Sequence, residues 1–151
     1  MKGSAIYTDG AVTRNGAPNA LAAWGIVHVL DGKEHFRSNG LVVTDPYHHD
    51  YVGAERHTNN TAEISAVYWA MRTAIALGVE RAVIVSDSKH AVAMVKGEMS
   101  AHKNKALVRQ ARALYIENAQ RFRFRWVKGH AGHRWNELAD KLAGEALGRT
   151  S

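Results

Sequence analysis

Four acidic residues lie in short motifs whose order along the chain could bring their carboxylates together. Asp9 stands in IYTDGA, Glu63 in TNNTAEISA, Asp87 in VIVSDSKHA and Asp140 in WVKGHAGHRWNELADKLA. Carboxylate oxygens are the ligands that hard divalent cations prefer, and two such cations can promote hydrolysis of a phosphodiester bond. One motif alone is weak evidence, because acidic residues also cap helices and open turns. The four motifs together predict a site for metal-dependent phosphodiester hydrolysis.

The elements that must position these residues follow from the apolar periodicity. Alternating or continuous apolar runs predict strands, and apolar residues three and four positions apart predict helices. The predicted strands are 4–9, 22–30, 34–43, 81–86 and 121–127, and the predicted helices are 60–78, 88–96, 104–118 and 134–147. Asp31-Gly32 is a favoured two-residue hairpin turn. The order βββαβααβα predicts an α/β fold with a mixed sheet.

This topology explains how the carboxylates could meet. Asp9 ends the first predicted strand and Asp87 follows the fourth, so both emerge at one edge if these strands are parallel neighbours. Glu63 is expected in the first turn of the first helix, and Asp140 on the last helix. Local alternatives are a turn at Asp9, a helix cap at Asp87, a capping box between Asn60 and Glu63, and a solvated position at Asp140. None of these alternatives predicts the set of flanking motifs.

Composition and charge restrict the class of protein. The 151 residues suit a single domain, 1–151, with a hydrophobic fraction of 46%. The start shows no charged and apolar leader and no apolar run approaches the length of a membrane span, so we expect a cytoplasmic protein without membrane contact. The absence of cysteine excludes disulfides and thiolate metal sites. A formal net charge of +6 predicts attraction to polyanions.

The motifs around the carboxylates resemble those of type 1 ribonuclease H, the bacterial-type enzyme that cuts RNA in RNA–DNA hybrids. TDG, TNNTAE, SDS and VKGHAGH followed by NELAD occur in the family's order, and the similarity covers nearly the whole chain. The resemblance implies a ribonuclease H-like fold with a five-stranded mixed sheet flanked by helices. It also implies an endoribonuclease that uses two Mg²⁺ ions, or Mn²⁺ instead, and leaves 5′-phosphate and 3′-hydroxyl ends.

The resemblance also assigns roles to residues. The metal ligands would be Asp9, Glu63, Asp87 and Asp140, of which Asp9 would bridge both ions. His130, in the glycine-rich loop 128–132, matches the family's proton-shuttling histidine, and an exposed loop histidine is the alternative. The residues expected to contact the hybrid are Asn15, Asn59 and Asn60 in the minor groove and Arg56, Thr58 and Asn104 around a DNA-strand phosphate. Asn19 is the alternative to Asn15, and Thr58 and Asn59 could instead shape the turn before the helix.

Some segments depart from the family pattern. Segment 96–105 is short, so the basic handle of many relatives is reduced or missing. The residues that could bind the substrate in its place are Lys96, His102, Lys103, Lys105 and Arg109, with Arg56 and Lys128 nearer the active edge. Loop 45–57 is longer than expected. A second metal site formed there by Asp45, His48, His49, Asp50 and His57 has weak support, and a solvated loop near the hybrid is favoured. We expect a monomer without a separate hybrid-binding module.

Two other functions remain open. One is a hybrid-binding module of the same fold that has lost cleavage, and the other is a different nuclease of the same broad fold, such as a resolvase, an integrase core or a proofreading exonuclease. The intact carboxylates and His130 argue against the first alternative. The TNN triplet before Glu63 and the GHAGH loop argue against the second.

Overall fold

The computed structural model describes residues 3–15 and 17–149. Along the chain the elements are β1 (Ser4–Val12), β2 (Ala22–Leu30), β3 (Lys33–Leu41), α1 (Asn59–Ala76), β4 (Ala82–Ser86), α2 (Lys89–Lys96), α3 (Lys105–Glu117), β5 (Phe122–Trp126) and α4 (Arg134–Ala146). The expected order βββαβααβα is confirmed. None of the helices in these described ranges is long and apolar enough to cross a membrane.

The five strands form one mixed sheet in the order β3-β2-β1-β4-β5. Strands β1, β2 and β3 make an antiparallel meander, whereas β4 lies parallel to β1 and β5 parallel to β4. Asp31 and Gly32 have φ values of 51° and 79°, as a two-residue hairpin turn of type I′ requires. The predicted α/β fold with a five-stranded mixed sheet is therefore confirmed.

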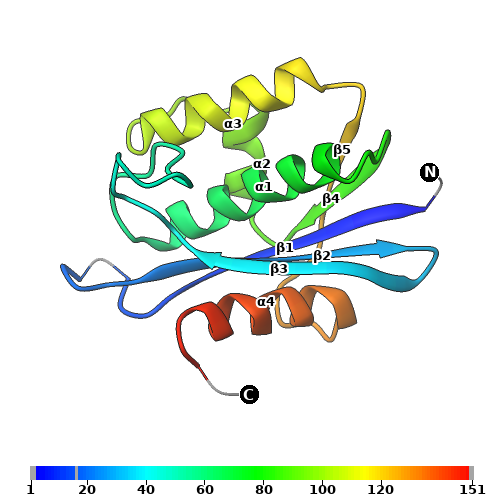
Figure 1. The fold of residues 1–151 in the computed structure, drawn as a ribbon, viewed down its shortest axis with the longest axis horizontal. Coiled ribbons are helices and arrows are strands. Elements are labelled where there is room, and N and C mark those ends of the chain that lie inside the picture. Colours follow the sequence, from blue (N-terminus) through cyan, green and yellow to red (C-terminus); the bar gives the residue numbers. More distant parts are fainter. Residues whose placement is uncertain (1–2, 16, 150–151) are drawn as a thin grey trace.

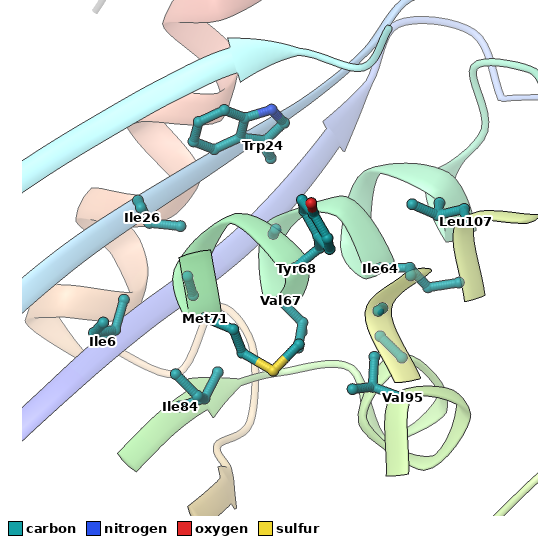
Figure 2. Close-up of a cluster of buried hydrophobic side chains, with 14 of the residues drawn as sticks. Ile6, Trp24, Ile26, Ile64, Val67, Tyr68, Met71, Ile84, Val95 and Leu107 are labelled. Carbon is teal, nitrogen blue, oxygen red and sulfur yellow. The ribbon is translucent and has the colours of Figure 1, made fainter. Parts of the chain in front are cut away.

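Helices cover the two faces of the sheet unequally (Figure 1). Helices α1, α2 and α3 lie on one face, and α4 lies alone on the other, where it packs across β1, β2 and β3. The larger core lies under α1 and includes side chains without exposed surface, among them Ile6, Ile26, Val67, Met71 and Ile84 (Figure 2). The smaller core lies under α4 and consists of Val27, Val29, Ala139 and Leu142. Burial of such side chains stabilises the fold by roughly 1.5–3 kcal/mol each.

The first strand is longer than expected. Antiparallel pairing with β2 continues to the pair Val12 and Ala22, whereas parallel pairing with β4 stops at Tyr7. The prediction that Asp9 ends the strand is therefore wrong, because β2 supports β1 beyond the point where β4 has ended. Asp9 lies in a segment of β1 that projects past the carboxyl end of β4.

The start of α1 also differs from the prediction. Thr58 is the N-cap, and the capping box joins Thr58 to Thr61: the Thr61 amide donates to Thr58 Oγ1 at 3.2 Å and the Thr58 amide to Thr61 Oγ1 at 2.8 Å. Glu63 lies two residues beyond Thr61, past the first turn, and takes no part in the cap. The alternative of a capping box between Asn60 and Glu63 is therefore wrong, so helix capping does not explain the carboxylate at position 63.

Strand β5 buries only part of its apolar side. Phe122 is 1% exposed, and Phe124 packs edge-on against Tyr115 of α3 with the ring centroids 5.3 Å apart. The alternation of Phe122, Phe124 and Trp126 with arginines in the sequence predicts a half-buried strand, but Trp126 is 46% exposed. The larger core includes Phe122 and contacts Phe124, but it does not extend to the end of the strand where Trp126 lies.

Candidate active site

Three carboxylates gather where β1 passes the end of β4. One oxygen from each of Asp9, Glu63 and Asp87 lies within 4.8 Å of the others, and Asp9 and Glu63 are only 5% and 7% exposed. The three side chains line a surface cavity of about 300 Å³, together with Gly10, Ser88 and the predicted site residues Asn59, His130 and Asp140. The structure thus brings all four predicted carboxylates and the predicted histidine to one cavity.

Gly10 allows Glu63 to reach Asp9 from the other face of the sheet. Ile6 packs in the core under α1 and Tyr7 against the core under α4, so strand alternation directs Asp9 toward α4 and Gly10 toward α1. The Gly10 amide donates to Glu63 Oε1 at 2.5 Å and to Asp9 Oδ1 at 2.9 Å. A Cβ at Gly10 would lie 2.6 Å from Glu63 Oε1, so no larger residue fits between β1 and α1.

Asp87 directly follows β4. It does not cap α2, which was the alternative role for this residue. Ser88 caps α2, with its hydroxyl accepting a hydrogen bond from the Ala91 amide at 3.0 Å. The Trp126 indole donates to the Asp87 carbonyl oxygen at 3.0 Å and fixes the backbone at this point. The Asp87 carboxylate is therefore directed to the cavity by backbone contacts and not by capping.

The loop that carries His130 lies directly over Asp87. A Cβ at Gly129 would be 2.5 Å from Asp87 Oδ2, so glycine permits this approach. His130 has a φ of 54°, a left-handed conformation that is uncommon outside glycine, although histidine adopts it more often than most residues do. The exposed imidazole borders the cavity from above the carboxylates.

Asp140 reaches the cavity from α4, on the opposite face from α1. Gly25 of β2 is the register partner of Asp9, and α4 lies directly on it. A Cβ at Gly25 would overlap the Ala139 carbonyl oxygen and approach the Ala143 amide nitrogen to 2.8 Å. The Asn39 side-chain amide also donates to the Leu142 carbonyl oxygen at 2.7 Å. These contacts hold α4 close enough to the sheet to place Asp140 beside Asp9.

The electrostatics of the cavity favour a bound cation. The pKa of Asp9 is raised from 3.8 to about 8, first by burial and then by the negative charge of Asp87. Burial, followed by the charges of Asp9 and Asp87, raises the pKa of Glu63 well above its ordinary value. Buried carboxylates that repel one another are unfavourable unless protons or a cation neutralise them. Three hard oxygen donors at this spacing fit a divalent metal ion.

The raised pKa of Asp9 predicts that stability in chelator decreases as pH rises. Between about pH 4 and pH 8 the folded protein holds a proton on Asp9 that the unfolded chain has released, so the free energy of unfolding should decline by up to about 1.4 kcal/mol per pH unit. Urea unfolding in EDTA at several pH values measures this slope, with Asp9→Asn as the reference protein that lacks the titrating group. Equal slopes for the two proteins would contradict the prediction.

Most of the predicted substrate contacts lie beside the cavity. Asn15 Oδ1 accepts a hydrogen bond from the Asn59 amide at 3.0 Å, which ties the first loop to the exposed start of α1. Asn60 is the next, exposed residue of α1. Arg56 and Thr58 line a neighbouring cavity of about 520 Å³. Thr58 also caps α1, which agrees with its alternative role of shaping the turn before the helix.

Asn104 is a buried residue that precedes α3. It is 7% exposed, precedes α3 with a φ of 55° and makes no side-chain hydrogen bond to the helix. Among the described residues, it does not line the cavity formed by Arg56 and Thr58. Arg56 and Thr58 therefore share one cavity, and the contact of Asn104 with a DNA-strand phosphate stays a prediction.

In loop 45–57, the structure assembles only part of the second metal site that was considered. Ligand atoms of His48, His49 and Asp50 lie within 4.8 Å of one another, and both imidazoles are exposed. His57 is engaged elsewhere, since its Nδ1 accepts a hydrogen bond from the Ala22 amide at 2.9 Å. The favoured interpretation of a solvated loop is consistent with this arrangement.

Residue types alone did not identify the glycines that shape the site. Gly10, Gly25 and Gly129 each permit a backbone or carboxylate approach that a Cβ would block. A signal was present for Gly25, because glycine inside an apolar strand often marks the close approach of another backbone.

Comparisons with known proteins agree with this fold and site. The family model described as RNase H matches residues 1–148. The Ribonuclease H of Chromobacterium violaceum is 33% identical, with 94% of this chain and 92% of the relative aligned. The Ribonuclease H of Treponema pallidum subsp. pallidum is 31% identical, with 97% of this chain and 91% of the relative aligned.

The crystal structure of RNase H1 from the halophilic archaeon Halobacterium salinarum NRC-1 gives a TM-score of 0.74 at 27% identity, over 96% of this chain and 97% of that one. The resemblance seen in the sequence is confirmed, and the chain belongs to the RNase H family of nucleases.

Proposed function

We propose that the protein is an endoribonuclease that hydrolyses the RNA strand of RNA–DNA hybrids with two divalent metal ions. The observation that supports this function is the single cavity of about 300 Å³ that Asp9, Glu63, Asp87 and Asp140 share with His130. Asn59 lines the same cavity and is held by Asn15, so groups that can hydrogen-bond to a 2′-hydroxyl lie next to the carboxylates. The expected products carry 5′-phosphate and 3′-hydroxyl ends.

The proposed roles of the carboxylates follow from their positions. When bound, two Mg²⁺ ions, or Mn²⁺ in their place, lower the pKa of a water and offset the negative charge on the reacting phosphate and the leaving 3′ oxygen. Asp9 is the central ligand in this proposal because, after burial, the charges of Asp87 and Asp140 and a hydrogen bond with Glu63 all act on its pKa. Glu63 and Asp87 complete one side of the site, and Asp140 supplies a ligand from α4.

His130 is proposed to transfer a proton between solvent and the reacting groups. Its exposed position on a loop at the cavity allows it to contact both the cavity and water. Histidine is the side chain best suited to proton transfer near neutral pH.

His130→Ala should slow hybrid cleavage by roughly 10²-fold or less, because water can partly replace a proton carrier that lies in an exposed loop. The measurement is the pH dependence of kcat for the parent and variant proteins. His133→Ala is the matched control, since His133 is exposed in the same segment and does not line the cavity in the described structure. A kcat profile of His130→Ala that matches the parent would remove His130 from the reaction.

A panel of substrates tests the proposed function directly. The protein is incubated with labelled RNA–DNA hybrid, double-stranded RNA, double-stranded DNA and single-stranded RNA, each with Mg²⁺, Mn²⁺ or chelator. Internal cuts are expected in the RNA of the hybrid, in the presence of metal. Binding of the hybrid without cleavage would favour the binding-module alternative, and efficient cutting of double-stranded DNA would favour another nuclease of this fold.

The start of α3 remains the candidate surface for binding the phosphates of the substrate duplex. Lys103 and Lys105 are exposed there, and Lys105 lines a surface cavity with Arg109 and Arg112. If about four to six phosphates are neutralised, the logarithm of hybrid affinity should fall with the logarithm of salt at a slope of roughly −4 to −5. Lys103→Ala with Lys105→Ala should reduce that slope by about one to two units and leave kcat nearly unchanged. An unaltered slope in this double variant would place that binding surface elsewhere.

A monomer made of one catalytic domain, 1–151, in the cytoplasm remains the prediction for the protein as a whole. Light scattering after size-exclusion chromatography tests the oligomeric state. Expression of a tagged protein followed by fractionation tests the location.

A further inference from the structure

The sheet face that α4 covers remains open over its β5 edge. Helix α4 packs across β1, β2 and β3, and in Figure 1 it lies beneath these strands, away from β5. Phe122 and Phe124 of β5 belong to the core on the other face. Because side chains alternate along a strand, Arg123 and Arg125 project from the open face, where both are exposed.

Among the described residues, no carboxylate forms an ion pair with Arg123 or Arg125. Arg125 donates to the Tyr7 hydroxyl at 3.1 Å, and Arg123 donates to the Phe122 carbonyl oxygen at 3.0 Å. Both acceptors are neutral, and in the described part of the chain neither arginine belongs to an ion pair. Arg123 also lines a groove of about 540 Å³ in which Arg81 and Arg121 outnumber the lining carboxylate of Glu80. This strand edge is therefore attractive to an anion.

An exposed aromatic ring at the end of this edge strand lies next to the active site, on the opposite face of the sheet from the two arginines. Trp126 ends β5, is 46% exposed, and its indole is fixed by the hydrogen bond to the Asp87 carbonyl oxygen. The Lys89 ammonium lies over one face of the ring, 4.3 Å from its centroid. An unpaired base can stack on the opposite face of such a fixed aromatic ring while nearby cations neutralise its phosphates.

We propose that the surface formed by Lys89, Trp126, Arg125 and Arg123, which passes around the β5 edge of the sheet and is called here the β5 surface, binds single-stranded nucleic acid that continues from the hybrid. A base stacks on the ring face of Trp126 opposite Lys89, and the strand turns around the edge of the sheet so that the arginines contact the phosphates that follow. A single strand fits better than a duplex, because only unpaired bases expose their faces to an aromatic side chain. The path rests on the proposed function, since the strand is taken to leave the cavity at Asp87, but binding itself requires no cleavage.

Fluorescence anisotropy in EDTA tests the proposal with three probes: a single-stranded oligonucleotide, a blunt RNA–DNA hybrid, and the same hybrid with a single-stranded overhang. The parent protein should bind the overhang hybrid more tightly than the blunt one. Arg123→Ala with Arg125→Ala should remove that preference and reduce the salt slope for the single strand by about 1.4, from two phosphates at roughly 0.7 each. Trp126→Ala should weaken single-strand binding by about fivefold or more.

Lys33→Ala with Arg37→Ala is the matched control. It removes two exposed cations from β3, the strand at the opposite edge of the sheet, and should leave the overhang preference intact. Thermal melts of all variants establish that each one is folded. Equal overhang preference in the parent, the β5 double variant and the control would overturn the proposal.

Two further outcomes separate this proposal from the alternatives. The β5 double variant should cleave blunt hybrid at the parent rate; if the parent itself cleaves no hybrid while single strands still bind through β5, the proposed function fails and the β5 surface stands. An acidic peptide that binds the parent but not the double variant, while the oligonucleotide binds both equally, would assign the surface to a protein partner and overturn the proposal.

Discussion

Replacing Asp9 by asparagine should reduce cleavage of an RNA–DNA hybrid by about 10³-fold or more, equivalent to several kcal/mol of lost transition-state stabilisation. Asp9 shares interactions with all three other carboxylates, so its replacement weakens every metal position that the cavity offers. The same change removes a buried carboxylate whose pKa is raised to about 8, so the variant should be more stable than the parent in chelator near pH 8. Initial rates with Mg²⁺ and urea unfolding in EDTA measure the two effects.

The opposite signs of these two effects distinguish loss of chemistry from loss of fold. Asp31→Asn is the matched control, because it makes the same chemical change in the hairpin turn, where asparagine also accepts a positive φ. The control should retain parent activity. Activity within a few-fold of the parent in Asp9→Asn, or a variant less stable than the parent at pH 8, would show that Asp9 does not have the proposed role.

Gly25→Ala should damage both stability and activity, although Gly25 contributes no side chain to the cavity. Its added methyl would overlap the Ala139 carbonyl oxygen and force α4 away from β2. Such overpacking costs about 1–3 kcal/mol, and a displacement of Asp140 by about 1 Å can slow the reaction by about 10²-fold. Urea unfolding and hybrid cleavage at saturating substrate measure the two losses.

Gly144→Ala tests whether the effect is specific to the contact between α4 and β2. Gly144 lies on the same helix, but its added methyl would meet only the flexible Arg149 side chain, with Cδ at 3.3 Å. Replacement of a helical glycine by alanine stabilises by roughly 0.5–1 kcal/mol where space allows, so this variant should retain activity and gain stability. Gly25→Ala with parent stability and activity would show that α4 adjusts freely and that Asp140 needs no fixed distance from Asp9.

The sequence predicted the element order and the members of the site because those features depend on local patterns. Apolar periodicity located the strands and helices, and the Asp31-Gly32 turn determined the hairpin. The parallel placement of β1 beside β4 follows from the helical crossover and accounts for the approach of Asp9 and Asp87. These inferences needed only residues close together in the sequence and general rules of topology.

The remaining differences depend on contacts between distant segments. The extension of β1 to Val12 requires β2 as a partner, and the exposure of Trp126 depends on how far the larger core reaches along β5. Glu63 illustrates the same limit, because its spacing from Asn60 suggested a cap, whereas the structure uses Thr58 and Thr61.

Because helices cover the two faces of the sheet unequally, the active site depends on the smaller and less stable of the two hydrophobic cores. Helix α4 is held by the smaller group of buried side chains, with Val27 and Val29 beneath it, and it is also the element that brings Asp140 to the cavity. Proteins open first where few apolar contacts hold an element in place. A transient release of α4 would leave the larger core folded and three carboxylates together, yet open the fourth side of the cavity. Mild denaturant or moderate heat should therefore abolish cleavage activity through local unfolding of α4, before the whole molecule unfolds.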